Sequence, residues 1–258
     1  MELIQIITLA LVQGLTEFLP ISSSAHLVLV SPLLGWPDQG LTFDIAVHVG
    51  TLVAVVAFYR ADLMRLARQM WRPGAAQTEV MLLAVATLPA VVAGLVLGDW
   101  LESWTRAPWV IATTTLVFAL ALGFADRKGR QRGVQVTLAI AVGIGLAQVL
   151  ALVPGTSRSG VTMTAALLLG LSRSDAARFS FLMAIPIIAG AALLLTKEAL
   201  DSGGAVNWSD LGLGALVSCL AAFACIRVFV GLIERIGMMV FVWYRVALSA
   251  ALFAWILW

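Results

Sequence analysis

The 258-residue chain contains 61% hydrophobic and only 12% charged residues, and its mean hydropathy is +1.01. These values exclude a soluble globular domain and indicate a polytopic membrane protein. The net charge of +2 is nearly neutral and does not indicate a nucleic-acid partner.

The N-terminal apolar segment is interrupted by the polar run Gln13-Gly-Leu-Thr-Glu17-Phe-Leu-Pro20-Ile-Ser22-Ser23-Ser24-Ala25-His26. Pro20 removes a backbone donor, and the serines after it can cap a new helix, so we expect one helix to end and another to begin here. A charged group at membrane depth costs roughly 2.5–3.5 kcal/mol on insertion scales, so such groups need partners or water. This segment is therefore a candidate functional site.

Six later apolar runs approach the roughly 20 residues that a bilayer crossing requires. They are Leu41–Tyr59, Val80–Gly98, Trp109–Ala125, Phe179–Thr196, Leu211–Leu232 and Met238–Leu257. We expect six full crossings.

Two of the connections between these runs are rich in basic residues. The connection after the first run contains Arg60, Arg65, Arg68 and Arg72, and a later connection contains Arg127, Lys128, Arg130 and Arg132. The positive-inside rule predicts that both connections are cytoplasmic.

A second polar interruption, Gln148 to Thr162, contains Pro154-Gly155-Thr156-Ser157-Arg158-Ser159-Gly160-Val161-Thr162. At an offset of 135 residues it aligns with the first, pairing Gln13 with Gln148, Ser22 with Ser157 and Ser24 with Ser159. Each segment is followed by three apolar runs. We therefore expect one membrane domain, residues 1–258, built from repeats over residues 1–125 and 134–258.

The charge pattern favours a re-entrant helical hairpin at each interruption rather than a single crossing. With hairpins, each repeat makes three crossings, and an odd number inverts the second repeat relative to the first. Residues 60–72, 126–133, 172–177 and 234–235 then share the basic side, whereas single crossings would move Arg173 and Arg178 to the opposite side. Broken backbone at membrane depth must be buried in protein or line a wet cavity, so we expect the two hairpin tips to meet near the midplane.

Both interruptions resemble the signatures of the undecaprenyl-diphosphate phosphatase family of bacterial membrane enzymes. The first signature, (E/Q)xxxE followed by a proline, a Ser/Thr cluster and a histidine, is matched from Gln13 to His26; the second, PGxSRSxxT, is matched from Pro154 to Thr162. The resemblance covers essentially the whole chain. Gln13 departs from members that have Glu there, so a second charged ligand is missing at this position.

The resemblance implies hydrolysis of undecaprenyl diphosphate to undecaprenyl phosphate and inorganic phosphate, which recycles the lipid carrier of cell-wall synthesis and confers bacitracin resistance. It implies a divalent cation, Mg²⁺ or Ca²⁺, with Glu17 as its ligand. The expected location is the bacterial inner membrane, with the active site facing the periplasm or exterior. The expected partners are the polyprenyl diphosphate and the bilayer, and a homodimer is compatible with this interpretation.

Within these segments, Ser23 and His26 form an i, i+3 pair that would let the imidazole activate the hydroxyl for attack on phosphorus. Attack by water activated by His26, or by His26 itself, remains an alternative. Arg158 offers a planar fork for two phosphate oxygens, and Glu17 completes the predicted catalytic set. The predicted substrate-binding residues are Gln13, Ser22, Ser24, Ser157, Ser159 and Thr162.

Other polar residues in apolar runs carry weaker signals. Asp44 and His48 form an i, i+4 pair, interpreted as a helix-terminus pair near the outer surface. Arg245, beside Tyr244, needs carbonyls, a carboxylate or water, and a structural role is expected. The competing functional interpretation is a polyprenyl-phosphate flippase or an anion transporter, since inverted repeats with broken helices also occur in transporters.

Overall fold

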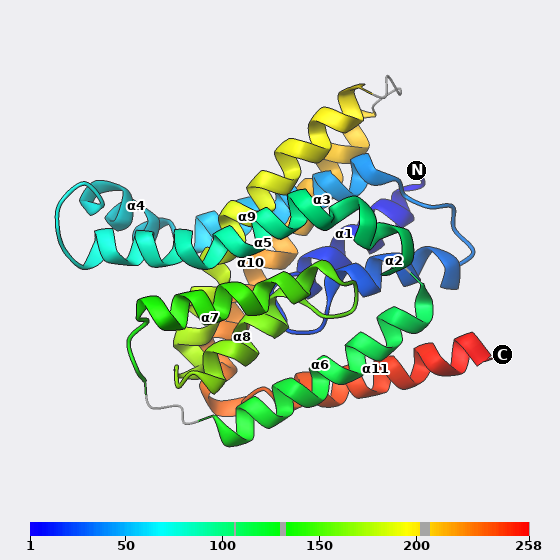
Figure 1. Cartoon of the computed structure of the whole chain (residues 1–258). Coiled ribbons are helices and arrows are strands. Elements are labelled where there is room, and N and C mark those ends of the chain that lie inside the picture. The colour runs from blue at the N-terminus through cyan, green and yellow to red at the C-terminus, as the bar shows by residue number, and fades with distance from the viewer. Residues whose placement is uncertain (106, 130–132, 202–206, 258) are drawn as a thin grey trace.

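The computed structural model describes residues 1–105, 107–129, 133–201 and 207–257, with side chains except at 28, 32, 98–105 and 198–201 (Figure 1). Over these residues the chain forms helices and connections and no strand. The α-helices are α1 Leu3–Thr16, α2 Ser23–Leu33, α3 Leu41–Phe58, α4 Arg60–Gln69, α5 Ala75–Thr105, α6 Pro108–Lys128, α7 Leu138–Val149, α8 Arg158–Leu168, α9 Arg173–Asp201, α10 Trp208–Ile236 and α11 Met239–Leu257. A short 3-10 helix, η1 (Leu150–Leu152), follows α7. Arg130 and Arg132 of the basic connection lie outside the described residues.

Six of the described helices are long and apolar enough to cross a membrane, which confirms the predicted number of crossings. The candidate spans are Leu41–Phe58, Ala75–Leu97, Pro108–Lys128, Arg173–Lys197, Trp208–Ile236 and Met239–Leu257. At a rise of about 1.5 Å per residue, each reaches most or all of the way across the roughly 30 Å hydrocarbon core. Several extend beyond the predicted apolar runs because a helix continues through polar residues at its ends.

The two polar interruptions each lie between a pair of shorter helices, α1 with α2 and α7 with α8. The helices of the second pair begin 135 residues after their counterparts, at Leu138 against Leu3 and at Arg158 against Ser23. Helices of 11 to 14 residues are too short to cross a bilayer. The match supports the repeat, while the re-entrant path and the inverted orientation stay predictions.

The two breaks have the same backbone geometry at equivalent residues. Ser22 and Ser157 have φ angles of 74° and 71°, and they are the non-glycine residues with positive φ in the described chain. Such a conformation is unfavourable for a residue with a Cβ, so it persists only where the surroundings stabilise it. At the second break the Ser157 hydroxyl accepts a hydrogen bond from the Gly160 amide (3.1 Å) and caps α8, as the serine pattern predicts.

The short helices before the two breaks each pack on a long helix from the other half of the chain. Helix α1 packs on α10, and α7 packs on α5. Glycines make both contacts close, because a Cβ on Gly14 would lie 2.6 Å from the Ser218 carbonyl oxygen and one on Gly145 the same distance from that of Ala86. Small residues allow such approach between helices in membranes.

Arg245, on α11, links the two breaks. It is fully buried and donates hydrogen bonds only to backbone carbonyl oxygens. These oxygens belong to Pro20 (3.3 Å) at the first break, Gly155 (2.9 Å) and Thr156 (3.0 Å) at the second, and Thr115 (3.2 Å) on α6. Arg245 thus has the structural role expected of it, and its partners are backbone carbonyl oxygens.

The connections that the charge pattern assigns to one side contact one another. The three contacts are Arg178 Nη2 to Asp62 Oδ1 (3.1 Å), Arg173 Nε to Asp126 Oδ1 (2.6 Å) and the Ser174 amide to Glu234 Oε1 (2.8 Å). The start of α9 therefore gathers the connections around residues 62, 126 and 234 at one end of the long helices. The chain terminus at Met1 pairs with Asp210, just inside α10 (3.2 Å).

Candidate active site

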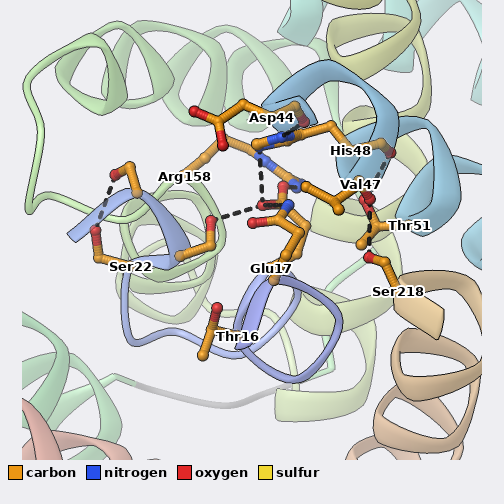
Figure 2. A network of polar contacts seen from close by, with 12 residues as sticks. Thr16, Glu17, Ser22, Asp44, Val47, His48, Thr51, Arg158 and Ser218 are labelled. Carbon is orange, nitrogen blue, oxygen red and sulfur yellow. Dashed lines mark hydrogen bonds and ion pairs between the residues drawn. The ribbon is translucent and has the colours of Figure 1, made fainter. Parts of the chain in front are cut away.

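Glu17 is the centre of a polar network formed by both breaks (Figure 2). It ends α1, and its side chain is only 8% exposed. One carboxylate oxygen, Oε1, accepts a hydrogen bond from Arg158 Nη2 at 2.9 Å. The other, Oε2, accepts from the Ser23 hydroxyl at 2.6 Å and from Gln13 Nε2 at 3.0 Å. The structure thus joins Glu17, Ser23, Arg158 and Gln13 in one network.

Arg158 is the first residue of α8, and its side chain is 13% exposed. Besides Glu17, it donates to the Ser180 carbonyl oxygen on α9 (3.2 Å) and lies over the ring of Phe18, 5.9 Å from its centroid. Each terminal nitrogen carries two protons, so both can donate again. These partners hold the guanidinium at the edge of the cavity described below.

His48 and Asp44, on α3, belong to the same site. His48 Nε2 lies 3.7 Å from Glu17 Oε2, and its Nδ1 lies 2.7 Å from the Asp44 carbonyl oxygen. The backbone contact orients the imidazole so that Nε2 faces the carboxylate. Asp44 lies in the first turn of α3, in agreement with the interpretation of a helix-terminus pair. The contact of His48 with Glu17 was not predicted; the signal that could have found it was a histidine inside an apolar crossing.

His26 lies away from this network. Its Nδ1 is 2.7 Å from the Ser22 carbonyl oxygen and its Nε2 is 2.6 Å from the Tyr244 hydroxyl, while the two rings stack with centroids 5.6 Å apart. The predicted pairing of Ser23 with His26 is therefore not formed. The reason is local. The Ser22 carbonyl oxygen, one turn earlier, holds the His26 imidazole against α11, whereas the Ser23 hydroxyl donates its hydrogen bond to Glu17.

The remaining predicted hydroxyls divide into two groups. Ser22 and Ser24, 3.3 Å apart at their hydroxyl oxygens, and Ser157 all line the cavity. Ser159 and Thr162 are buried and hold the fold together. Ser159 donates to the Leu19 carbonyl oxygen (2.8 Å), and the Thr162 hydroxyl contacts that of Ser180 (2.7 Å). Gln13 is likewise fully buried behind Glu17.

A cavity of about 380 Å³ opens in front of the network, and both polar and apolar side chains line it. The polar lining residues are Glu17, Ser22, Ser23, Ser24, Asp44, His48, Gln148, Ser157 and Arg158. The apolar wall includes Leu41, Ile45, Leu152, Ile187, Ile188 and Leu195. The combination suits a ligand with an anionic head and a hydrocarbon tail.

Within the described chain, no group of three or more His, Cys, Asp or Glu side chains is placed to hold a metal ion. Glu17 already accepts hydrogen bonds from three neighbours through its two oxygens. Glu17 and Asp44 are the carboxylates that line the cavity, and Asp44 Oδ1 accepts a hydrogen bond from Gln39 Nε2 at 3.0 Å. Carboxylate oxygens suit Mg²⁺, but an ion at this place would need further oxygen ligands, such as those of a bound phosphate.

Comparison with known proteins gives the family of this chain. The sequence profile described as "Bacitracin resistance protein BacA" matches residues 6–251, a range that includes both breaks and Arg245. This chain belongs to the BacA family. A BacA-family relative from Hahella chejuensis, named undecaprenyl-diphosphatase, is 51% identical over 99% of both chains. Relatives with the same name from Alcanivorax borkumensis (51% identical over 99% of this chain and 100% of that one) and Saccharophagus degradans (52% over 98% of both) are equally similar.

Proposed function

We propose that this BacA-family protein hydrolyses undecaprenyl diphosphate to undecaprenyl phosphate and inorganic phosphate. The observation that carries the proposal is the Ser23–Glu17–Arg158 arrangement, in which a hydroxyl, a carboxylate and a guanidinium meet in a cavity with an apolar wall. The name shared by the curated relatives supports the substrate.

The Ser23 hydroxyl attacks the terminal phosphorus, and Glu17 Oε2, at 2.6 Å from Ser23 Oγ, accepts its proton. The new Oγ–P bond forms as the bridging P–O bond breaks, and undecaprenyl phosphate leaves with the electron pair of that bond and takes up the proton held by Glu17. Water then attacks the phosphoserine while the regenerated Glu17 carboxylate accepts its proton; the Oγ–P bond breaks, Glu17 returns the proton to Ser23 Oγ, and inorganic phosphate leaves. Direct attack of water on the diphosphate is the alternative that trapping of phosphoserine would eliminate.

Arg158 stabilises the charge that spreads over the phosphoryl oxygens, which is the main requirement of phosphoryl transfer. The amides at the start of α2 and α8, together with Ser22, Ser24 and Ser157, add donors to the same oxygens. Glu17 and Asp44 would hold a divalent cation together with the diphosphate, and the bound cation would neutralise part of its charge.

The tail of the substrate continues from the apolar wall of the cavity into a neighbouring groove of about 590 Å³ between α3 and α9. The two spaces share Ala192, and Val49, Leu52, Ala189 and Leu193 line the groove. This groove offers a lateral exit to the hydrocarbon phase for a chain too long to fit inside the protein.

The proposed location is the bacterial inner membrane, with the cavity open to the periplasm or exterior. The supporting observation is that the basic connections gather at the other end of the helices, around Arg173 and Arg178. Hydrolysis on the outer face would return the lipid carrier to cell-wall synthesis.

The test is release of inorganic phosphate from undecaprenyl diphosphate by the detergent-purified protein, with Mg²⁺ or Ca²⁺ and with excess chelator. We expect release that requires the cation and is lost in Arg158→Ala. Micelles have no sides, so a flippase or transporter would give no signal there. Absence of release from protein with an intact melting transition would overturn the proposed hydrolysis.

A further inference from the structure

Helices α6 and α11 pack side by side along one edge of the molecule (Figure 1). A surface groove of about 330 Å³ lies between the last turns of α6 and the first turns of α11. Leu120 and Phe124 line it from α6, and Val242, Trp243 and Val246 line it from α11. The groove is therefore apolar along the helices.

The side chains of this groove face the surroundings rather than the helix bundle. Leu120 is 58% exposed, Phe124 is 59% exposed and Trp243 is 64% exposed. All three lie on candidate membrane spans, so the groove faces lipid. Trp243 is in the first turns of α11, near the helix end, where an amphipathic indole ring favours the boundary between hydrocarbon and headgroups.

Arg127 and Lys128 line the same groove at the end of α6 and are exposed. The carboxylate before them, Asp126, is occupied by Arg173 and by the Met238 amide. Among the described residues, neither Arg127 nor Lys128 forms a hydrogen bond or ion pair. The α6 dipole and the positive-inside rule explain cations at this helix end. They do not explain a shaped apolar groove directly beside two uncompensated cations.

We propose that this groove binds one two-chain anionic phospholipid, such as phosphatidylglycerol, from the leaflet that it faces. The lipid phosphate accepts hydrogen bonds from Arg127 and Lys128, and the acyl chains lie along Leu120 and Phe124 on one side and Val246 on the other. Basic pockets between membrane helices recognise anionic headgroups in this way. The site is independent of the proposed hydrolysis.

A second copy of the chain is the other conceivable occupant, and charge argues against it. Copies inserted in the same orientation are related by an axis along the membrane normal, so equal residues meet at equal depth. A contact through this face would bring two Arg127–Lys128 pairs close together without counter-charge. An anionic headgroup instead supplies the missing charge.

The test is retention of lipid by the full-length protein in native mass spectrometry, with phosphatidylglycerol or phosphatidylcholine added to the detergent. We expect one phosphatidylglycerol to be retained in preference to phosphatidylcholine, and retention to weaken as salt is raised. Replacing both cations (Arg127→Gln with Lys128→Gln) should weaken binding about tenfold to thirtyfold. The matched control, Arg68→Gln with Arg72→Gln, removes two exposed arginines outside the groove and should bind like the parent.

A second measurement locates the bound lipid. Brominated phosphatidylglycerol should quench tryptophan fluorescence more than brominated phosphatidylcholine, and Trp243→Phe should remove that difference. Equal lipid retention by the two double variants, or a difference in quenching between the two brominated lipids that survives Trp243→Phe, would overturn the proposal. Cross-linking between cysteines introduced at position 243 of two copies would also overturn it and assign the groove to a dimer.

Discussion

The Ser23 hydroxyl lies 2.6 Å from Glu17 Oε2, although Glu17 directly follows α1 and Ser23 begins α2. The break between α1 and α2 turns the chain so that the end of one helix faces the start of the next. Arg158, from the break between α7 and α8, donates a hydrogen bond to the other carboxylate oxygen of Glu17, Oε1. The proposed site thus takes Glu17 and Ser23 from the break between α1 and α2 and Arg158 from the break between α7 and α8, so it needs both breaks.

Removing the hydroxyl or the carboxylate should abolish most turnover with the fold intact. For Ser23→Ala and Glu17→Gln we expect the rate of phosphate release to fall by about 10²–10⁴-fold, the usual value of nucleophile activation by a positioned base. Ser24→Ala is the matched control, since it deletes a neighbouring hydroxyl in the same cavity, and it should mainly raise KM. A Ser23→Ala variant with the parental kcat would exclude Ser23 as the nucleophile.

Arg158 should not be replaceable by lysine. Arg158→Lys keeps a positive charge near Glu17 but loses the planar fork that holds two phosphate oxygens, so we expect kcat/KM to fall by roughly 10²-fold. Melting temperature serves as the check on folding, and it should stay close to that of the parent. Full activity in Arg158→Lys would show that charge alone is sufficient.

The two histidines should have opposite importance. His48 faces Glu17 across 3.7 Å inside the cavity, whereas His26 bonds Tyr244 outside it. We expect His48→Ala to lower phosphate release at least tenfold, with a positioned polar partner of Glu17 lost. His26→Ala should retain most of the activity and lower the melting temperature instead. The reverse ranking would restore the predicted Ser23–His26 pair.

The two histidines show which part of the candidate site could not be predicted from the sequence. Prolines, serines and a guanidinium in apolar runs were sufficient to predict both breaks and to select Glu17 and Arg158, because those signals are local and chemically costly. The partner of His26 is a tyrosine 218 residues later, and His48 reaches Glu17 through packing of α3 on α1. A helical period places residues on a face, but it does not say which distant helix covers that face.

Arg245 should control stability more than chemistry. Arg245→Met would fill similar volume but leave carbonyl oxygens of both breaks without donors, and each unsatisfied group costs about 1–3 kcal/mol. We expect a large loss of thermal stability, measured as a lower melting temperature in detergent, together with loss of activity. Tyr244→Phe is the adjacent control and should melt near the parental temperature. An unchanged melting temperature in Arg245→Met would show that water replaces the guanidinium at the breaks.

Blocking the groove between α3 and α9 should make the enzyme sensitive to the length of the prenyl chain. Ala189 lines this groove but not the cavity, so Ala189→Phe fills the exit without touching the polar network. A lipid tail is already in hydrocarbon, so the groove guides the tail through shape rather than through hydrophobic transfer. The phenylalanine side chain would overfill the groove between α3 and α9, so Ala189→Phe should raise KM for the C55 diphosphate about tenfold.

Dimethylallyl diphosphate, whose tail ends inside the cavity, should be hydrolysed by Ala189→Phe as by the parent. Ala250→Phe places the same ring on an exposed position of α11 and should leave both substrates unaffected. An equal loss with both substrates would mean that Ala189→Phe disturbs the cavity itself. Unchanged kinetics with C55 would mean that the tail leaves the protein between other helices.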